Sequence, residues 1–363
     1  MRIAVYAPLK PPDDPTPSGD RRVARALGAA IAHAGHTVDW PSRLRSFDRR
    51  GDPLRQARLA RLGARVSSRL LRGYAGGKPR PDLWLTYHLY YKAPDHLGPP
   101  IARRLGIPYV VAEASVAMKR AGGAWDIGHR AVLDALSHAR AVVSLNPRDD
   151  AALNAHLAAG CARVALAPFM ALSPPPGARR PEAAHVRLLA VAMMRPGDKA
   201  RSFALLAQAL TRIEDRPWRL RIAGDGEARA VVEAMFARFG DRVTFLGLRD
   251  ETDLAADLAT ADIFVWPAIN EAFGMALLEA QAAGVPAVAG DFGAVGSILA
   301  DGETGLLAGP DSTADFADKL ARLIDDADLR ARMGRAARAK AERAHGIDVA
   351  ARELDALFRR LAA

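Results

Sequence analysis

Two carboxylates in the second half of the sequence, Glu271 and Glu279, are placed where they could bind the hydroxyl groups of a ligand. The apolar run Ile263–Trp266 predicts a strand that ends at Pro267, and a helix is predicted to begin near Gly274. Glu271 would then stand at the carboxyl end of the strand and Glu279 on the helix, whose unpaired first amides could bind a phosphate or a sugar hydroxyl. The alternative is structural: Glu271 is a helix-start carboxylate favoured by the helix dipole, and Glu279 is a solvated helix residue.

Two cations follow an earlier predicted strand. Arg195 and Lys199 lie in the loop after Val186–Ala192. At the end of a strand they could clamp a diphosphate, the arginine as a fork and the lysine as a point charge. Further along, Gly224 and the residues after it predict a tight turn into a helix, but the full glycine pattern of a dinucleotide-binding loop is missing. No Asp-x-Asp motif stands at a predicted strand end, so we expect no metal site.

The first half offers aromatic and polar residues at the end of another predicted strand. His88, Tyr90, Tyr91 and Lys92 come close behind it. Aromatic rings beside a cation suit a sugar, through stacking and hydrogen bonding, and the alternative is an aromatic cluster that packs a loop. Gly19, at the first predicted junction between a loop and a helix, either lets the backbone approach a ligand or only begins the helix.

The elements that must position these residues alternate along the chain. Short runs rich in Val, Ile and Leu are separated by longer amphipathic stretches, which is typical of parallel strands joined by crossover helices. The predicted strands are Arg2–Tyr6, Val38–Trp40, Leu83–Thr86, Tyr109–Ala112, Ala141–Leu145, Val186–Ala192, Arg219–Ala223, Val243–Leu246, Ile263–Trp266 and Ala287–Ala289. We therefore predict an α/β protein of two doubly wound, Rossmann-like domains that face each other across a cleft, since ligands of such sheets lie beyond the carboxyl ends of the strands.

The predicted domain organisation has four segments. Residues 1–172 form an N-terminal domain, and the Pro-rich residues 173–184 form a linker, because they cannot continue a strand or a helix. Residues 185–345 form a C-terminal domain. Residues 346–363 form a last helix that could pack back on the N-terminal domain.

Composition limits the class of protein. The chain has 363 residues, half of them apolar and a quarter charged, as in globular proteins of two domains. The excess of basic residues, 51 − 41 = 10, suits phosphate-bearing partners such as nucleotides, nucleic acid or anionic lipid, and the alternative is a coding bias toward Arg and Ala.

The single cysteine, Cys161, favours a reducing compartment. We predict that the opening residues form a strand and not a signal peptide, and no apolar stretch approaches the ~18 residues needed to cross a bilayer.

Taken in order, the segments of the second half resemble the glycosyltransferases of family 4, whose members have the GT-B fold. The resemblance runs through Arg195 and Lys199, Ala223–Gly226, Val243–Gly247, Glu271–Glu279, Ala283–Pro286 and Asp301–Leu307. The two glutamates with Phe-Gly between them are its specific part, whereas the Gly-Asp-Gly turn is common. The opening strand, the Ser-Gly that follows it and the Gly-His-Thr-Val at residue 35 also resemble the start of the family.

The resemblance implies transfer of a sugar from a nucleotide-diphosphate sugar to a glycan, a lipid-linked or a small-molecule acceptor, with retention and without a cofactor. It implies that Glu271 contacts the donor sugar and Glu279 the ribose. Arg195 and Lys199 should hold the diphosphate and stabilise its negative charge as it leaves. The remaining implied donor contacts are Phe273, Gly274, Met275, Gly224, Thr244, Leu246 and Gly19.

The sequence departs from the family pattern at two places. Similar proteins often carry Gly-Gly-x-x-Glu before the Asp-Gly-x-Thr-Gly run, but this chain has Ser297 in place of the glutamate. Many relatives place a histidine where Ala114 stands, so another group must take its role. The acceptor-side candidates are His88, Tyr91, Glu113 and Ser115. Two rival functions stay open: a nucleotide-sugar epimerase or hydrolase of the same fold, and a non-catalytic nucleotide-sugar-binding protein.

An arginine-rich insertion precedes the third predicted strand. Ten arginines lie between Arg43 and Arg72, and Leu59, Leu62, Val66 and Leu70 recur among them at helical spacing. Such a helix could rest on anionic lipid headgroups, or it could be a solvated surface helix whose apolar side meets its own domain. Nucleic acid is not expected as a partner, because no known binding module is present. We expect a cytoplasmic protein, and leave open that it binds the inner face of the membrane.

Overall fold

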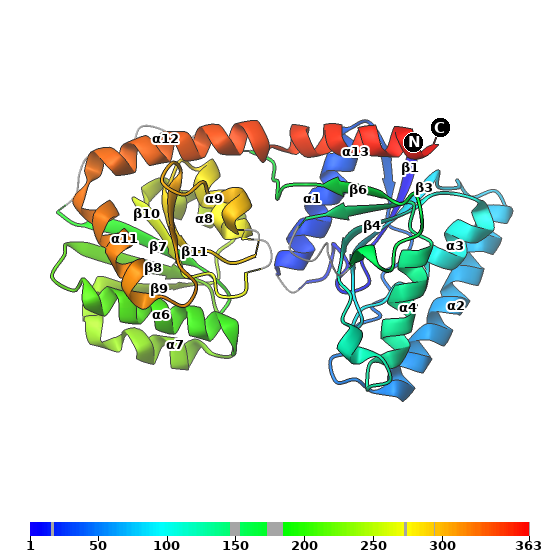
Figure 1. Ribbon diagram of the computed structural model, residues 1–363, viewed down its shortest axis with the longest axis horizontal. Helices are drawn as coiled ribbons and strands as arrows, with labels where there is room; N and C mark the ends of the chain where they lie inside the picture. Colours follow the sequence, from blue (N-terminus) through cyan, green and yellow to red (C-terminus); the bar gives the residue numbers. More distant parts are fainter. Residues whose placement is uncertain (16–17, 146–152, 173–183, 272–273, 294, 363) are drawn as a thin grey trace. The chain divides into compact units, whose positions relative to one another are not determined.

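The computed structural model describes residues 1–15, 18–145, 153–172, 184–271, 274–293 and 295–362, and the chain divides into two units (Figure 1). Unit 1 comprises Met1–Leu166 and Ile347–Ala363, and unit 2 comprises Ala167–Gly346. The predicted linker, residues 173–184, lies outside the described residues except for Ala184.

Unit 1 is built on a sheet of six parallel strands in the order β2-β1-β3-β4-β5-β6. The strands are β1 (Arg2–Tyr6), β2 (Thr37–Asp39), β3 (Leu83–Leu89), β4 (Tyr109–Ala114), β5 (Ala141–Ser144) and β6 (Ala162–Ala165). The order reverses between β1 and β3, so the loops that leave these two strands diverge to opposite faces of the sheet. A ligand site in such a sheet is expected at the carboxyl ends of the strands on either side of the reversal.

The helices of unit 1 are α1 (Gly19–His33), α2 (Pro53–Ala75), α3 (Gly98–Leu105), α4 (Asp126–Ser137) and α13 (Ile347–Ala362), with a 3-10 turn η1 (Met118–Arg120). Helix α13 packs on α1, and His33 Nε2 of α1 lies 2.8 Å from Oδ1 of Asp348 in α13. The start of α2 is fixed by local chemistry, since the Asp52 carboxylate accepts hydrogen bonds from the amides of Leu54 and Arg55.

Unit 2 also has six parallel strands, in the order β12-β11-β10-β7-β8-β9. They are β7 (Val186–Val191), β8 (Trp218–Ala223), β9 (Val243–Gly247), β10 (Ile263–Trp266), β11 (Ala287–Gly290) and β12 (Gly305–Ala308). Here the order reverses between β7 and β10, so the loops after these two strands border the expected ligand site.

The helices of unit 2 lie on both faces of its sheet (Figure 1). They are α6 (Asp198–Arg212), α7 (Arg229–Phe236), α8 (Glu251–Thr260), α9 (Met275–Ala282), α10 (Val295–Ile298), α11 (Thr313–Asp325) and α12 (Ala327–Ala344), with a 3-10 segment η3 (Ala237–Arg242). Fully buried aromatic side chains fill the core that the helices form with the sheet: Phe203, Trp218, Phe236, Phe264 and Phe316.

The predicted fold class, two Rossmann-like α/β domains, is confirmed by these two sheets. All ten predicted strands are present: β1 and β10 have the predicted ends, and the ends of the others differ by at most three residues. The prediction missed β6 and β12, which are only four residues long. Within the described part of the chain, no helix is both long and apolar enough to cross a membrane.

Candidate functional site

The strongest candidate site lies where the loops after β7 and β10 meet in unit 2. Lys199, in the first turn of α6, places its Nζ 2.5 Å from Oε2 of Glu271, which follows β10. The same oxygen accepts a hydrogen bond of 3.1 Å from the Trp266 indole, and Lys199 Nζ lies 5.3 Å from the centre of that ring. The structure therefore brings two predicted site residues, Lys199 and Glu271, together at the strand reversal, with Trp266 as a shared partner.

The loop that carries Glu271 is held in a strained shape against α6. Ala268 and Asn270 have φ values of 56° and 52°, in the left-handed region that residues with a side chain rarely adopt. The Ile269 amide donates to Ser202 Oγ at 3.1 Å, and the Asn270 side chain donates to Asp198 at 3.0 Å. These hydrogen bonds attach the loop to α6 and thereby position Glu271 at the carboxyl end of the sheet.

Arg195, the second predicted cation, is exposed in the loop between β7 and α6. Its carbonyl accepts a hydrogen bond of 3.1 Å from the Ala200 amide, which closes the loop. Its guanidinium has no ion pair with any residue that the structure describes. It is therefore a cation near the site that is free to bind an anion.

The turn at Gly224 packs against the loop that carries Arg195. Gly224 and Gly226 have φ values of 140° and 153°, and a Cβ on Gly224 would lie 1.9 Å from the carbonyl oxygen of Ala192. The Met194 amide donates to the Asp225 carbonyl at 2.9 Å. Both glycines are thus required because two loop backbones lie in contact, and the turn positions the loop of Arg195.

Helix α9 directs its amino end toward the same edge of the sheet. Gly274 precedes it with φ 65°, and no side chain among the described residues caps its first turn. The first amides, from Met275 onward, are therefore available to an anion. Glu279 lies in α9 and is only 6 % exposed, so the alternative that it is a solvated helix residue is wrong. Phe273 lies outside the described residues.

The two predicted contacts on β9, Thr244 and Leu246, lie on the edge strand of the sheet. Thr244 pairs in register with Arg221 in the middle of β8, below the carboxyl ends of the strands. It lines a hollow of about 300 Å³ together with Arg187, Arg219 and Thr260. The structure does not bring Thr244 to the Lys199–Glu271 pair. Leu246 lies near the carboxyl end of β9, beside Gly247. The Gly247 carbonyl accepts a hydrogen bond of 2.8 Å from the Gly224 amide.

In unit 1 the strand reversal carries a carboxylate–histidine pair. His88, at the end of β3, places Nδ1 2.8 Å from Oδ1 of Asp20, in the first turn of α1. Burial would raise the pKa of Asp20, but the hydrogen bond and the electrostatic interaction with His88 lower it below its usual value. His88 has φ 61°, again in the left-handed region. A proton held on Nδ1 leaves Nε2 for a ligand, and Gly19 beside Asp20 is open, with nothing within 4 Å of its would-be Cβ.

The other acceptor-side candidates lie at the ends of β3 and β4. The Tyr91 ring contacts Trp125 edge-to-face at 5.7 Å. Glu113 has φ 59°, and its carboxylate accepts a hydrogen bond of 3.3 Å from the Leu145 amide. The amide of Ser115 donates to the Leu89 carbonyl at 3.0 Å. All three therefore border the carboxyl edge of the unit 1 sheet, as His88 does. Tyr91 is also linked to His88 by a row of ring contacts through Tyr90.

Sequence reasoning missed Asp20, Trp125, Trp266 and Arg120 as partners of the predicted residues. Asp20 could have been noticed, because an acidic residue directly after the first strand–loop unit stands beside Gly19. The tryptophans gave no such signal, because buried and site-lining tryptophans look alike in a sequence. Among the described residues, no group of three or more His, Cys, Asp or Glu is placed to hold a metal ion.

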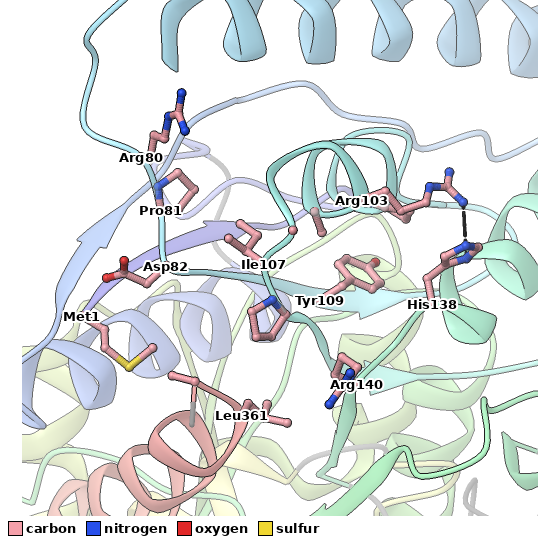
Figure 2. A pocket seen from close by; sticks show the side chains of 15 residues that line it. Met1, Arg80, Pro81, Asp82, Arg103, Ile107, Tyr109, His138, Arg140 and Leu361 are labelled. Carbon is pink, nitrogen blue, oxygen red and sulfur yellow. Dashed lines mark hydrogen bonds between the residues drawn. The ribbon is translucent and has the colours of Figure 1, made fainter. Parts of the chain in front are cut away.

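Another hollow lies elsewhere in unit 1. It has a volume of about 920 Å³ and is lined by the amino ends of the unit 1 strands, including Asp82, Tyr109 and Arg140, and by Leu361 of α13 (Figure 2). Arg103 at its rim donates to His138 at 2.8 Å, the bond drawn in Figure 2. Because ligands of such sheets lie at the carboxyl ends of strands, size alone does not identify this hollow as the site.

Comparison with known proteins places this geometry in a family context. Residues 191–340 match the family model of glycosyl transferases group 1. The chain is 44% identical over 93 residues to D-inositol 3-phosphate glycosyltransferase of Corynebacterium glutamicum (strain R), covering 26% of this chain and 22% of that protein. It is 32% identical over 157 residues to alpha-D-kanosaminyltransferase of Streptomyces kanamyceticus, covering 43% of this chain and 40% of that protein. The matches thus span about a fifth to two fifths of these relatives.

Solved structures share the fold over the whole chain. Sucrose-phosphate synthase from Thermosynechococcus elongatus superposes with a TM-score of 0.76 at 21% identity and covers 99% of both chains. Anabaena HepE in complex with UDP-glucose superposes with a TM-score of 0.69 at 17% identity, again over 99% of both chains. The predicted GT-B fold is confirmed by these neighbours, and the predicted glycosyltransferase resemblance of the second half is confirmed at the level of group 1.

Proposed function

We propose that this protein is a family 4 glycosyltransferase that moves a sugar, with retention, from a nucleotide-diphosphate sugar bound by unit 2 to an acceptor bound by unit 1. One observation carries the proposal. The Lys199–Glu271 pair stands at the β7/β10 reversal, inside the segment that matches the group 1 model. A cation and a carboxylate at adjacent strand ends suit a sugar diphosphate: the cation can bind the diphosphate, and the carboxylate can accept hydrogen bonds from the sugar hydroxyls.

The proposed chemistry follows from the charge that develops in the reaction. When the bond between the anomeric carbon and the diphosphate oxygen breaks, negative charge collects on the leaving diphosphate. Lys199 and Arg195 would stabilise that charge, and the amides at the start of α9 would add the positive end of the helix dipole. Glu271 would accept hydrogen bonds from the hydroxyls of the sugar, and Glu279 from those of the ribose.

The donor nucleotide can be found by a thermal-shift screen of nucleoside diphosphates. Because a structural neighbour holds UDP-glucose, UDP is the first to test, followed by GDP, ADP and dTDP. A ligand that binds only the folded state raises the midpoint of unfolding. The sugar form of the best nucleotide is then incubated with and without candidate acceptors, and the products are analysed. Transfer to an acceptor with the anomeric configuration kept supports the proposal.

The same analysis separates the rival functions. Free sugar as the only product, both with and without the acceptors, indicates a hydrolase, and an altered sugar still attached to the nucleotide indicates an epimerase. Tight donor binding with no product under any condition indicates a non-catalytic binding protein. Any of these three results contradicts the proposed transfer.

We also propose that α2 binds an anionic membrane surface, which would place the reaction at the inner face of the membrane. Helix α2 contains six arginines and no acidic residue. All six are exposed and have no ion pair with a described residue: Arg55, Arg58, Arg61, Arg65, Arg69 and Arg72. Leu54 and Leu62 beside them are 82% and 41% exposed, whereas Val66 and Leu70 pack against the core of unit 1. The exposed face therefore combines positive charge with two apolar side chains.

Co-sedimentation with liposomes tests this surface. The wild type should sediment with anionic vesicles at low salt, stay in the supernatant with neutral vesicles, and be released by high salt, because the attraction is screened beyond about 8 Å at physiological ionic strength. Changing Arg58, Arg61, Arg65 and Arg69 to Gln should abolish sedimentation. A wild type that stays in the supernatant with anionic vesicles at low salt makes α2 an ordinary surface helix.

A further inference from the structure

A row of aromatic rings runs along the carboxyl edge of the unit 1 sheet. His88 contacts Tyr90 at 4.9 Å between ring centres, and Tyr90 contacts Tyr91 at 5.7 Å. Tyr91 in turn meets Trp125, which precedes α4, at 5.7 Å. The row therefore links the loop after β3 to the loop after β4, and it leads from the His88–Asp20 pair to Trp125.

Two cations lie on the far end of this row. The Arg120 guanidinium is 5.1 Å from the Tyr91 ring centre and 4.8 Å from the Trp125 ring centre. Lys92 Nζ is 5.8 Å from the first and 5.4 Å from the second. Two positive charges thus share one pair of rings, and their mutual repulsion is partly offset by the ring faces.

No carboxylate among the described residues pairs with either cation. The nearby Asp48 accepts hydrogen bonds from the Asp52 amide at 2.9 Å and from the Gln56 side chain at 2.8 Å. Asp126 forms its ion pair with Arg130 at 2.8 Å. Arg120 also keeps a buried Nε without a hydrogen-bond partner among the described residues, which is costly.

We infer that Lys92 and Arg120 form a subsite for a phosphate group carried by the acceptor. An arginine fork and a lysine point charge on the same two rings suit a phosphate, whose negative charge would offset both cations. The rings of Tyr91 and Trp125 hold both side chains in place before the ligand arrives. The identification of this ligand as the acceptor rests on the proposed function, in which the second substrate binds at this edge of unit 1.

The position of the subsite also fits the reaction. The phosphate would lie at the Trp125 end of the ring row, and the hydroxyl-bearing part of the acceptor would extend along the rings toward His88. His88 Nε2, the ring nitrogen not used by Asp20, could then accept a hydrogen bond from the acceptor hydroxyl. The acceptor class is therefore a phosphorylated polyol or sugar, whether free or as a lipid headgroup.

Fluorine NMR of the full chain labelled with 5-fluorotryptophan tests the subsite without an activity assay. The chain has five tryptophans, and three report on different places. Trp125 reports on the proposed subsite, and Trp266 on the donor site through its bond to Glu271. Trp84 is fully buried and reports on the folding of unit 1. The probes are glycerol 3-phosphate, glycerol, sodium chloride at matched ionic strength, and vesicles containing phosphatidylinositol.

We expect glycerol 3-phosphate to shift the Trp125 signal saturably, and glycerol and chloride to leave it unchanged. Arg120→Gln and Lys92→Gln should each weaken this response at least fivefold while the Trp84 signal stays at its wild-type position. Arg130→Gln, which removes an exposed arginine of α4 that is already paired, should respond like the wild type. If only the vesicles shift Trp125, and only with Arg120 present, the phosphate belongs to a lipid headgroup and the subsite is supported.

A Trp125 response that chloride reproduces, or that both substitutions leave intact, overturns the subsite. So does the absence of any response to glycerol 3-phosphate and to vesicles alike. The proposed function is judged separately on the same spectra, because a nucleoside diphosphate should shift Trp266. Loss of the Trp266 response with a retained Trp125 response would reject donor binding and keep the phosphate subsite.

Discussion

At the scale of single residues, the donor site depends on a lysine and a glutamate that neutralise each other before any ligand binds. Lys199 and Glu271 are paired, and Trp266 shares the same carboxylate oxygen. The two residue types were predictable from their positions after two strands. Their contact was not, because it depends on left-handed backbone at Ala268 and Asn270 that no local pattern indicates.

Replacing either cation of this site with alanine should weaken nucleoside-diphosphate binding. The loss of a charge-assisted hydrogen bond corresponds to about 1.5–3 kcal/mol, or roughly ten- to a hundredfold in the dissociation constant. Lys199→Ala should have the larger effect, because it also leaves the Glu271 carboxylate uncompensated beside the diphosphate. Calorimetric titration measures both, with Arg212→Ala at the other end of α6 as the control. Unchanged affinity in both variants removes the cations from the diphosphate site.

The two glutamates should separate in kinetics. Glu271→Gln keeps an oxygen for the Trp266 indole but removes the charge near the transferred sugar, so kcat should fall with little change in donor affinity. Glu279→Gln should mainly raise the donor KM. Steady-state kinetics against donor concentration distinguishes the two effects, and Glu251→Gln on the exposed start of α8 should behave as wild type. The reverse pattern would show that the roles are exchanged.

At the scale of elements, strand ends and glycine turns set where these residues stand. The sequence pattern predicted the strands from which every candidate leaves, because buried parallel strands have long apolar runs. It missed β6, whose side chains are all at least partly exposed, and it predicted only the middle of α2. Asp52 and Pro53 are ordinary signals for a helix start, and they would have extended that prediction to the observed beginning.

Gly224 should be the turn glycine that tolerates substitution least. Gly224→Ala places a Cβ 1.9 Å from the Ala192 carbonyl and demands a φ of 140°, so the free energy of unfolding should fall by at least about 2 kcal/mol. Urea unfolding measures this. Gly19→Ala, where the added carbon meets nothing within 4 Å, should unfold like the wild type. Equal stability of the two variants would contradict the close approach of the loops at Gly224.

The packing of α2 on the segment before α3 should make stability depend on pH. Gly63 of α2 lies against His96, and burial lowers the pKa of His96 to about 4. The unfolded chain has a histidine pKa near 6.5, so between these values it binds a proton that the folded protein does not. The free energy of unfolding should therefore fall as the pH drops from about 6.5 to about 4, by up to about 3 kcal/mol for this group.

Urea unfolding across that pH range checks the expectation. His96→Asn should flatten the dependence, because the asparagine binds no proton in either state. The same change at His185, before β7 in unit 2, is the control for the loss of a histidine outside this packing. If His96→Asn retains the full slope of the wild type, another buried group causes it.

At the scale of the whole molecule, two Rossmann-like units each present a strand reversal with a paired carboxylate and base. In unit 2 the pair is Glu271 with Lys199, and in unit 1 it is Asp20 with His88. The two-domain fold was predictable because alternating strands and amphipathic stretches continue on both sides of a Pro-rich segment. The acceptor side was much less predictable, because its candidates meet through loops whose shapes depend on long-range packing.

The central claim is that unit 2 binds a nucleotide-diphosphate sugar at the β7/β10 reversal. Hydrogen–deuterium exchange of the full chain, with and without the nucleoside diphosphate selected by thermal shift, tests it most directly. We predict slower exchange at residues 194–200, 269–271 and 275–279, which are the loops that carry Lys199 and Glu271 and the first part of α9. In Lys199→Ala at the same ligand concentration, exchange at these residues should equal that of the ligand-free protein. Protection confined to other segments, or no nucleoside diphosphate that binds at all, would contradict the account.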